Sequence, residues 1–428
     1  MTVFLRSFYL LFFFMVSVNA AEKKPIPDPL DLSTALLFAE KTHPNLSIAD
    51  SNISLAANAK DFIQSHGDLK LSLESRLQYI EPSSIATNQD NDDHRIGLVA
   101  SKSLYDSGRL NSQLKYADFT IKSERLKKIH IINKRKLEIK QRFYDVVLAD
   151  MNFYRYNEEM ATKFIAFDRT RDRLEIGQRA DIDVMQLDVD YKKARYLRIK
   201  SQNEQRISRT RLAIAMGRPS ELVNTVSKPK RIKKLKSLPE LEVLNKVALE
   251  HNYTIALLKN KLSAAYEAVQ LAKKTTSPTI NFEATGFEYS RQLQNRPDFQ
   301  VGVVMRIPLF AGRTEDLAVS KALSKVDLIK SEIELAKSDV LNSIVSHWFE
   351  FEALEGKLLQ MEALTDYREI YLDRSRALYE LEVKTDLGDA MARVSEAERD
   401  YLKTQFQMQI VRSKIELEVG KTLSDIIK

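Results

Sequence analysis

Two patterns of apolar and polar residues divide the chain. Four segments, residues 69–79, 94–105, 279–290 and 299–309, alternate apolar and polar side chains with a period of two, which is typical of β-strands with one apolar face. In the first segment the apolar residues are Leu69, Leu71, Leu73, Leu77 and Tyr79. The alternation predicts two β-hairpins, at residues 69–105 and 279–309, made of strands of about 11 to 12 residues.

The rest of the chain follows a helical period and contains few helix breakers. Neither glycine nor proline occurs from residue 109 to residue 176, which predicts a single helix of roughly 100 Å. Two runs have the heptad-like spacing of helices that pair. Their members are Met160, Phe164, Phe167, Arg171 and Leu174, and Ala322, Val326, Ile329, Ile333, Ala336 and Val340. Gly177 follows the first run and precedes an aspartate that can cap a returning helix, so we expect a helical hairpin there.

The chain is a tandem repeat of one unit. The segment that ends in Gly108 and Arg109 corresponds to the one that ends in Gly312 and Arg313, and Gly217 corresponds to Gly420. We expect a first repeat at 21–222, with a helix, the β-hairpin 69–105 and a long helical hairpin at 109–218. The second repeat, at 241–428, has a helix, the β-hairpin 279–309 and a long helical hairpin at 313–420. A basic linker, 223–240, joins them; it is interpreted as a solvated segment or as a contact for acidic periplasmic partners or peptidoglycan.

The amino terminus predicts export from the cytoplasm. Arg6 precedes an apolar run from Phe8 to Val18, and Ala20 ends a small-residue pattern, as in a cleaved signal peptide at residues 1–20. An uncleaved anchor is the alternative. Because export separates the protein from nucleic acid, we expect no nucleic-acid partner despite the net charge of +7, from 66 Lys and Arg against 59 Asp and Glu.

Composition also limits the chemistry of the chain. It has no cysteine, its six histidines lack the spacing of a zinc motif, and no G-x-G-x-x-G or phosphate loop is present. We therefore expect no catalytic residues, no metal and no cofactor.

The strand lengths suit a tilted strand that crosses a bilayer, since such strands need about 9 to 11 residues. A soluble antiparallel sheet, with its apolar side covered, has the same alternation. In the membrane interpretation four strands are too few to close a barrel and open edges are excluded from lipid, so several protomers have to complete the wall.

With a signal peptide and two copies of a helix, a β-hairpin and a long helical hairpin, the chain resembles the TolC-type outer-membrane efflux protein family. The fold class implied is mainly α with β-hairpins, in a tandem-repeat protomer of an outer-membrane β-barrel that continues into a long α-helical barrel. The resemblance implies a homotrimer in outer-membrane lipid with its helical barrel in the periplasm. It would act as the passive exit duct of a tripartite efflux or type I secretion system, with a periplasmic adaptor and an inner-membrane pump as partners.

The resemblance also assigns roles to individual residues. Strand-to-helix turns are expected at Gly108, Pro308 and Gly312, with Ser103 in place of the proline in the first copy. The tip expected to bind the adaptor contains Leu174, Gly177, Asp183 and Val184. A periplasmic gate is expected at Asp389, with Asp386 as a possible second member; a plain helix cap or a solvated charge is the alternative for Asp389.

Two further classes of protein remain open from the sequence. One is a periplasmic coiled-coil adaptor or scaffold without channel activity, and the other is a structural protein of the cell envelope with the same fold. An adaptor should have one central helical hairpin flanked by β-rich domains, whereas this chain has two hairpins, each preceded by strands. That order favours the channel.

Overall fold

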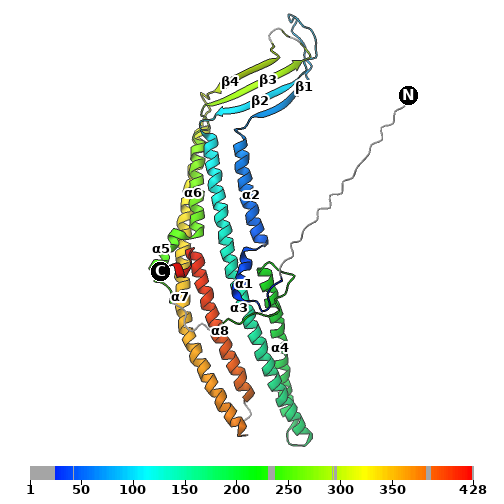
Figure 1. Cartoon of the computed structure of the whole chain (residues 1–428), viewed down its shortest axis with the longest axis vertical. Coiled ribbons are helices and arrows are strands. Elements are labelled where there is room, and N and C mark those ends of the chain that lie inside the picture. Colours follow the sequence, from blue (N-terminus) through cyan, green and yellow to red (C-terminus); the bar gives the residue numbers. More distant parts are fainter. Residues whose placement is uncertain are drawn as a thin grey trace, which may run out of the picture.

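The computed structural model describes residues 25–41, 43–229, 237–291, 293, 296–381 and 387–426. The predicted signal peptide, Asp386 and most of the basic run of the linker lie outside these residues. The described chain is elongated, with a β-sheet at one end and helices running away from it to two hairpin ends (Figure 1).

The same order of elements occurs in both halves of the chain. The first half contains α1 (Leu32–Leu37), η1 (Phe38–Glu40), α2 (Pro44–Ser65), β1 (Lys70–Arg76), β2 (Arg95–Tyr105), α3 (Arg109–Glu175) and α4 (Asp181–Ala215). The second contains α5 (Leu241–His251), α6 (Tyr253–Ala272), β3 (Thr279–Tyr289), β4 (Phe299–Arg306), α7 (Thr314–Glu380), α8 (Leu387–Val419) and α9 (Leu423–Ile426). Helices α3 and α7 have 67 residues each, so the uninterrupted helix predicted between residues 109 and 176 is confirmed.

The helices form a layer that is four helices wide. Near the sheet the order across the layer is α2, α3, α6, α7, and at the far end it is α4, α3, α8, α7 (Figure 1). Helices α3 and α7 therefore run the full length of the layer. Helix α2 occupies the position beside α3 near the sheet and α4 occupies it at the far end; in the same way α6 and α8 occupy the position between α3 and α7. In a single chain α2, α4 and α7 form the open sides of this layer.

Two apolar cores hold the middle of the layer together. The first surrounds Phe143 and Tyr144 of α3. The Tyr144 ring stacks on the Phe406 ring of α8, with the two centroids 4.2 Å apart. Burial raises the pKa of Tyr144 to about 12. The second surrounds Ile344 and Phe351 of α7, with Trp348 packed against it. Four members of the second heptad-like run, Val326, Ile329, Ile333 and Val340, are buried as its spacing predicts.

The first heptad-like run is less buried than its spacing predicts. Phe164 is 43% exposed, and Arg171 is also exposed. The Phe164 ring lies 5.4 Å from that of Tyr191 on the returning helix α4. The contact with Tyr191 leaves much of the Phe164 side chain open to solvent.

The four strands form one antiparallel sheet in the order β1-β2-β3-β4. β1 has seven residues and β4 eight, so these two strands are shorter than predicted. β4 ends two residues before Pro308, whose ring nitrogen has no hydrogen to donate to a ladder. After β1 the backbone N–H of Gln78 donates to Nδ1 of His94 at 3.2 Å, in place of a strand carbonyl.

The loops that connect the strands at the outer end of the sheet are joined. Arg296 pairs with Asp93 at 2.6 Å, which lowers the pKa of Asp93. Arg291 is buried and donates to the carbonyl of Asn88. These arginines therefore cross from one loop to the other and tie the two loops together.

Candidate functional site

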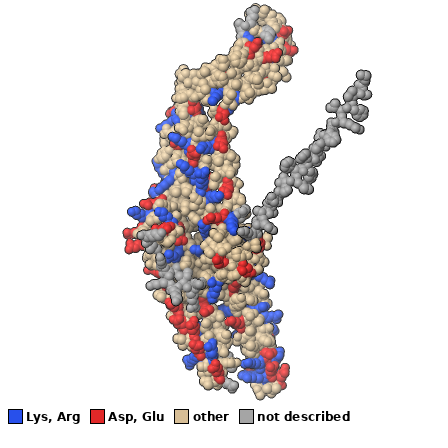
Figure 2. Space-filling view, viewed as in Figure 1, with Lys and Arg blue, Asp and Glu red and all other residues tan. Residues whose placement is uncertain are grey.

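One face of the sheet is apolar and uncovered. The register places twelve apolar residues on this face: 71, 73, 96, 98, 100, 280, 282, 284, 299, 301, 303 and 305. Ser75, Lys102, Gly286 and Glu288, at the ends of the strands or opposite them in the ladder, lie on the same face. Leu71 is 67% exposed, Phe299 69% and Val301 61%, because no helix of the described chain covers them. Figure 2 shows few charged side chains over the sheet and many over the helices. A soluble sheet would have this face covered.

The two outer strands of the sheet leave their edges open. β1 pairs only with β2, and β4 only with β3, among the described residues. Unpaired edge groups invite another strand, and they are excluded from lipid unless they are paired. The outer edges of β1 and β4 are therefore available for pairing with further strands.

Each of the two strand-to-helix turns contains a glycine with positive φ, but the turns differ in packing. Gly108 and Gly312 have φ of 75° and 61°, which favours glycine. In the first turn the carboxylate of Asp106 accepts from the N–H groups of Gly108 at 2.9 Å and Leu110 at 2.5 Å, as an N-terminal cap of α3. In the second turn Leu309 and Phe310, which follow Pro308, are 94% and 91% exposed. The sequence analysis did not identify Asp106 as a cap, although aspartate just before a helix is a preferred capping residue.

The turn between α3 and α4 closes at Gly177, which has φ of 72°. Its N–H donates to the carbonyl of Leu174 at 2.9 Å, and the next N–H, of Gln178, donates to Arg173 at 2.8 Å. This is the glycine-dependent helix ending that the sequence predicts. The predicted aspartate cap is wrong: Asp181 already belongs to α4, and the preceding Ala180 has no side chain that could accept.

The four predicted tip residues lie together at this end, and three apolar neighbours accompany them. Leu174 and Val184 are half-buried, whereas Gly177 and Asp183 are exposed. Asp183 lies 3.7 Å from Arg179. The apolar neighbours are Ile176, Ile182 and Met185, at 67%, 69% and 64% exposure. The sequence analysis, which assigned tip residues from the resemblance to the family, did not identify these three. They could have been found as apolar residues that do not belong to the heptad-like run.

The second hairpin end differs in charge and packing. Asp389, the third residue of α8, accepts from Nε of Arg393 at 2.9 Å, and this pairing raises the pKa of Arg393. Gly388 lies so close to α3 that a Cβ there would be 2.4 Å from Cγ2 of Thr162. Asp386, the second predicted gate residue, lies outside the described residues. The sequence analysis missed Arg393, although its spacing of four from Asp389 is a helical pairing signal.

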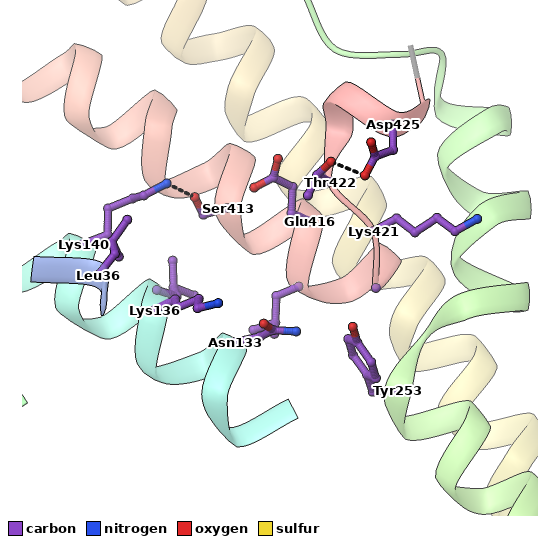
Figure 3. A pocket seen from close by; sticks show the side chains of 13 residues that line it. Leu36, Asn133, Lys136, Lys140, Tyr253, Ser413, Glu416, Lys421, Thr422 and Asp425 are labelled. Atoms are coloured by element: carbon purple, nitrogen blue, oxygen red, sulfur yellow. Dashed lines mark hydrogen bonds between the residues drawn. The ribbon is translucent and has the colours of Figure 1, made fainter. Parts of the chain in front are cut away.

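A pocket of about 450 Å³ lies where α8 ends and α6 begins (Figure 3). Lys140 of α3 points across it and donates to Oγ of Ser413 at 2.6 Å, and burial lowers the pKa of this lysine. Glu416 and Asp425 supply opposite charge at the other side. No cluster of three potential metal-ligating side chains occurs in the described part of the chain. None of its helices is long and apolar enough to cross a membrane.

Several solved structures have the same arrangement. The outer membrane protein VceC from Vibrio cholerae matches with a TM-score of 0.70 at 14% identity, over 92% of this chain and 96% of that one. The CmeC outer membrane channel of Campylobacter jejuni matches with a TM-score of 0.74 at 13% identity, over 92% and 88%. The chain has the TolC-type fold. The MtrE outer membrane channel of Neisseria gonorrhoeae shares it, with a TM-score of 0.67 at 15% identity over 92% and 89%.

The similarity to solved structures is not accompanied by a match in the sequence comparisons. No family model matches the sequence, and no curated protein matches it either. The fold class implied by the resemblance in sequence, mainly α with β-hairpins and long helical hairpins, is confirmed.

Proposed function

We propose that the protein is an outer-membrane channel that passively conducts substrates from the periplasm to the exterior. The observation that carries this proposal is the uncovered apolar face of a sheet with two open edges. In a bilayer that face contacts lipid, and each edge pairs with the next copy of the sheet. Two of the similar structures are described as outer membrane channels, which supports the same use of the fold.

The protein acts as a homotrimer in this proposal. Each copy contributes its four strands, and three copies supply twelve, a number within the range of closed outer-membrane barrels. The helical layer closes in the same way, because its open sides, α2 and α4 on one hand and α7 on the other, lie below the two edges of the sheet. The helical barrel then projects into the periplasm.

The periplasmic end of this duct meets the rest of an efflux or type I secretion system. A periplasmic adaptor would contact the α3–α4 tip, where Ile176, Ile182 and Met185 expose apolar surface around Gly177 and Asp183. An inner-membrane pump would supply the energy, since the chain itself has no nucleotide-binding motif. Asp389 would contribute to closing the duct together with Arg393.

The proposal is tested by the location and assembly of two matched variants. Val301 lies on the apolar face of β4, and its neighbour Gln300 lies on the opposite face. Val301→Lys places a charge in lipid, which costs about 2–4 kcal/mol at the bilayer midplane, whereas Gln300→Lys does not. We expect wild type and Gln300→Lys to fractionate with the outer membrane and to run as an oligomer on unheated SDS gels. Val301→Lys should lose that oligomer.

Two outcomes would contradict the channel. A soluble periplasmic monomer would mean that the sheet is covered by a partner protein, as in an adaptor or scaffold. Equal assembly of the two lysine variants would mean that the apolar face does not contact lipid.

A further inference from the structure

The polar face of the sheet has an unequal distribution of charge. The strand register places four cationic side chains on it but only two carboxylates. The cations are Lys70, Arg76, Arg95 and Arg306, and the carboxylates are Glu74 and Glu283. The other strand residues on this face are uncharged. Each copy of the chain therefore has an excess of two positive charges on the side opposite to the apolar face.

Three of these cations are free to act on a passing solute. Arg95 donates to Glu74 at 2.5 Å, and this pair is electrically neutral. Lys70, Arg76 and Arg306 are exposed, and no carboxylate of the described residues lies within ion-pair distance of them. Glu283 shares a ladder row with Lys70 but lies two strands away, about 10 Å at ordinary strand spacing.

The three cations are spread along the height of the sheet. Arg76 pairs in the ladder with Arg95 at the outer end of β1, and Arg306 pairs with Thr279 at the end next to the helices. Lys70 lies at the start of β1, also near the helices. A solute that crosses the sheet section therefore passes positive charge at both ends.

Negative charge at the hairpin end of the helices is partly offset. Asp389 is the residue expected to make that end acidic, and its carboxylate is paired with Arg393 at 2.9 Å. A ring of Asp389 residues would therefore be accompanied by an equal ring of arginines. The sheet section, in contrast, has cations without partners.

We propose that this polar face lines the pore and selects anions, so that the permeant solutes are of the anionic class. The inference rests on the proposed channel function, because only a closed wall turns the polar face inward. Rings of Arg and Lys favour anions in pores, as rings of Asp and Glu favour cations. Three copies would line the wall with twelve cations and six carboxylates.

The test is the reversal potential of the purified oligomer in a planar lipid bilayer under a tenfold KCl gradient. A low salt concentration is used because screening within about 10 Å at 0.1 M weakens the effect of the charges. We expect wild type to conduct chloride better than potassium, so that the ratio of chloride to potassium permeability is above one. The triple variant Lys70→Gln, Arg76→Gln, Arg306→Gln has one excess negative charge per chain on this face, so its ratio should fall below one.

Two single variants serve as controls for position and assembly. Lys102→Gln removes the same charge from the same sheet but from the apolar side, where Lys102 pairs with Phe282, and should leave the ratio unchanged. Gln300→Lys adds a charge to the polar face and should raise the ratio. Gln300→Lys also provides the test if the triple variant fails to assemble, because it removes no existing contact.

The outcomes separate the selectivity from the channel function. An inserted oligomer that never conducts contradicts the channel itself. A conducting wild type that prefers potassium, or a Gln300→Lys variant with the wild-type ratio, leaves the channel intact and overturns the assignment of anions.

Discussion

Replacing Gly388 by alanine should loosen the packing of α8 on α3 near the hairpin ends. The new Cβ would lie 2.4 Å from Cγ2 and 2.6 Å from Oγ1 of Thr162. Carbon atoms pack at about 3.5–4.0 Å, so the helices have to separate by roughly 1 Å or Thr162 has to turn away. Overpacking of this kind costs about 1–3 kcal/mol. Arrangements with more widely separated helix ends therefore become about 5- to 150-fold more populated relative to the observed one.

The assay is single-channel conductance, together with entry of a bulky antibiotic that the outer membrane normally excludes. Gly388→Ala should raise both. Thr162→Ala removes the two γ atoms and leaves only Cβ, at 3.1 Å, so the double variant should return toward wild type. Gly356→Ala is the matched control, since nothing lies within 4 Å of its Cβ and alanine suits a helix interior better by about 0.5–1 kcal/mol.

Failure of the rescue would refute this reasoning. If the double variant leaks as much as Gly388→Ala, the contact with Thr162 is not the cause. If Gly356→Ala leaks equally, the effect belongs to any added methyl group in these helices.

Three other predictions concern charge and backbone. Asp389→Ala and Arg393→Ala should raise conductance by similar amounts, because each removes the same ion pair; an effect of Asp389→Ala alone would favour an acidic ring. Gly420→Ala should lower the melting temperature more than Gly177→Ala: both glycines have φ above 70°, but only at Gly420 would a Cβ lie 2.2 Å from a main-chain oxygen. Burial lowers the pKa of His130, so thermal stability should fall as the pH drops through about 6.5, where the unfolded chain takes up the proton more readily, and His130→Phe should flatten this dependence.

The length of α3 could be predicted because no breaker interrupts it and the first glycine after residue 109, Gly177, follows its end. Helix α7 is equally long but continues past Gly356, so a glycine alone does not end a helix that is packed on both sides of it. Strand ends were harder to predict, since a strand ends where its partner stops pairing. Leu77 and Tyr79 continue the alternation of β1, but the regular ladder stops at Arg76 and Arg95, and beyond it an isolated bridge joins Tyr79 to Asp92.

The part of the candidate site that depends on local backbone conformation could also be predicted. Gly177 and Gly108 are local requirements of the backbone, and both have the expected positive φ. Arg393 contacts Asp389 within α8, whereas Thr162 of α3 contacts Gly388 from another helix. Residues 162 and 388 are far apart in the sequence and leave no local pattern, so the close approach at Gly388 required the three-dimensional structure.

The central ladder of the sheet has a consequence for the order of folding. β2 belongs to the first half of the chain and β3 to the second, and Arg95 pairs with Tyr289. When the amino-terminal half has been synthesised and the second half has not, β2 has no β3 to pair with, and the leucines of the β1–β2 hairpin are exposed to water. Such long-range pairing is slow, and exposed strand edges aggregate. The hairpin therefore keeps an open edge, available to other unfinished chains, until its own second half arrives and β3 pairs with β2.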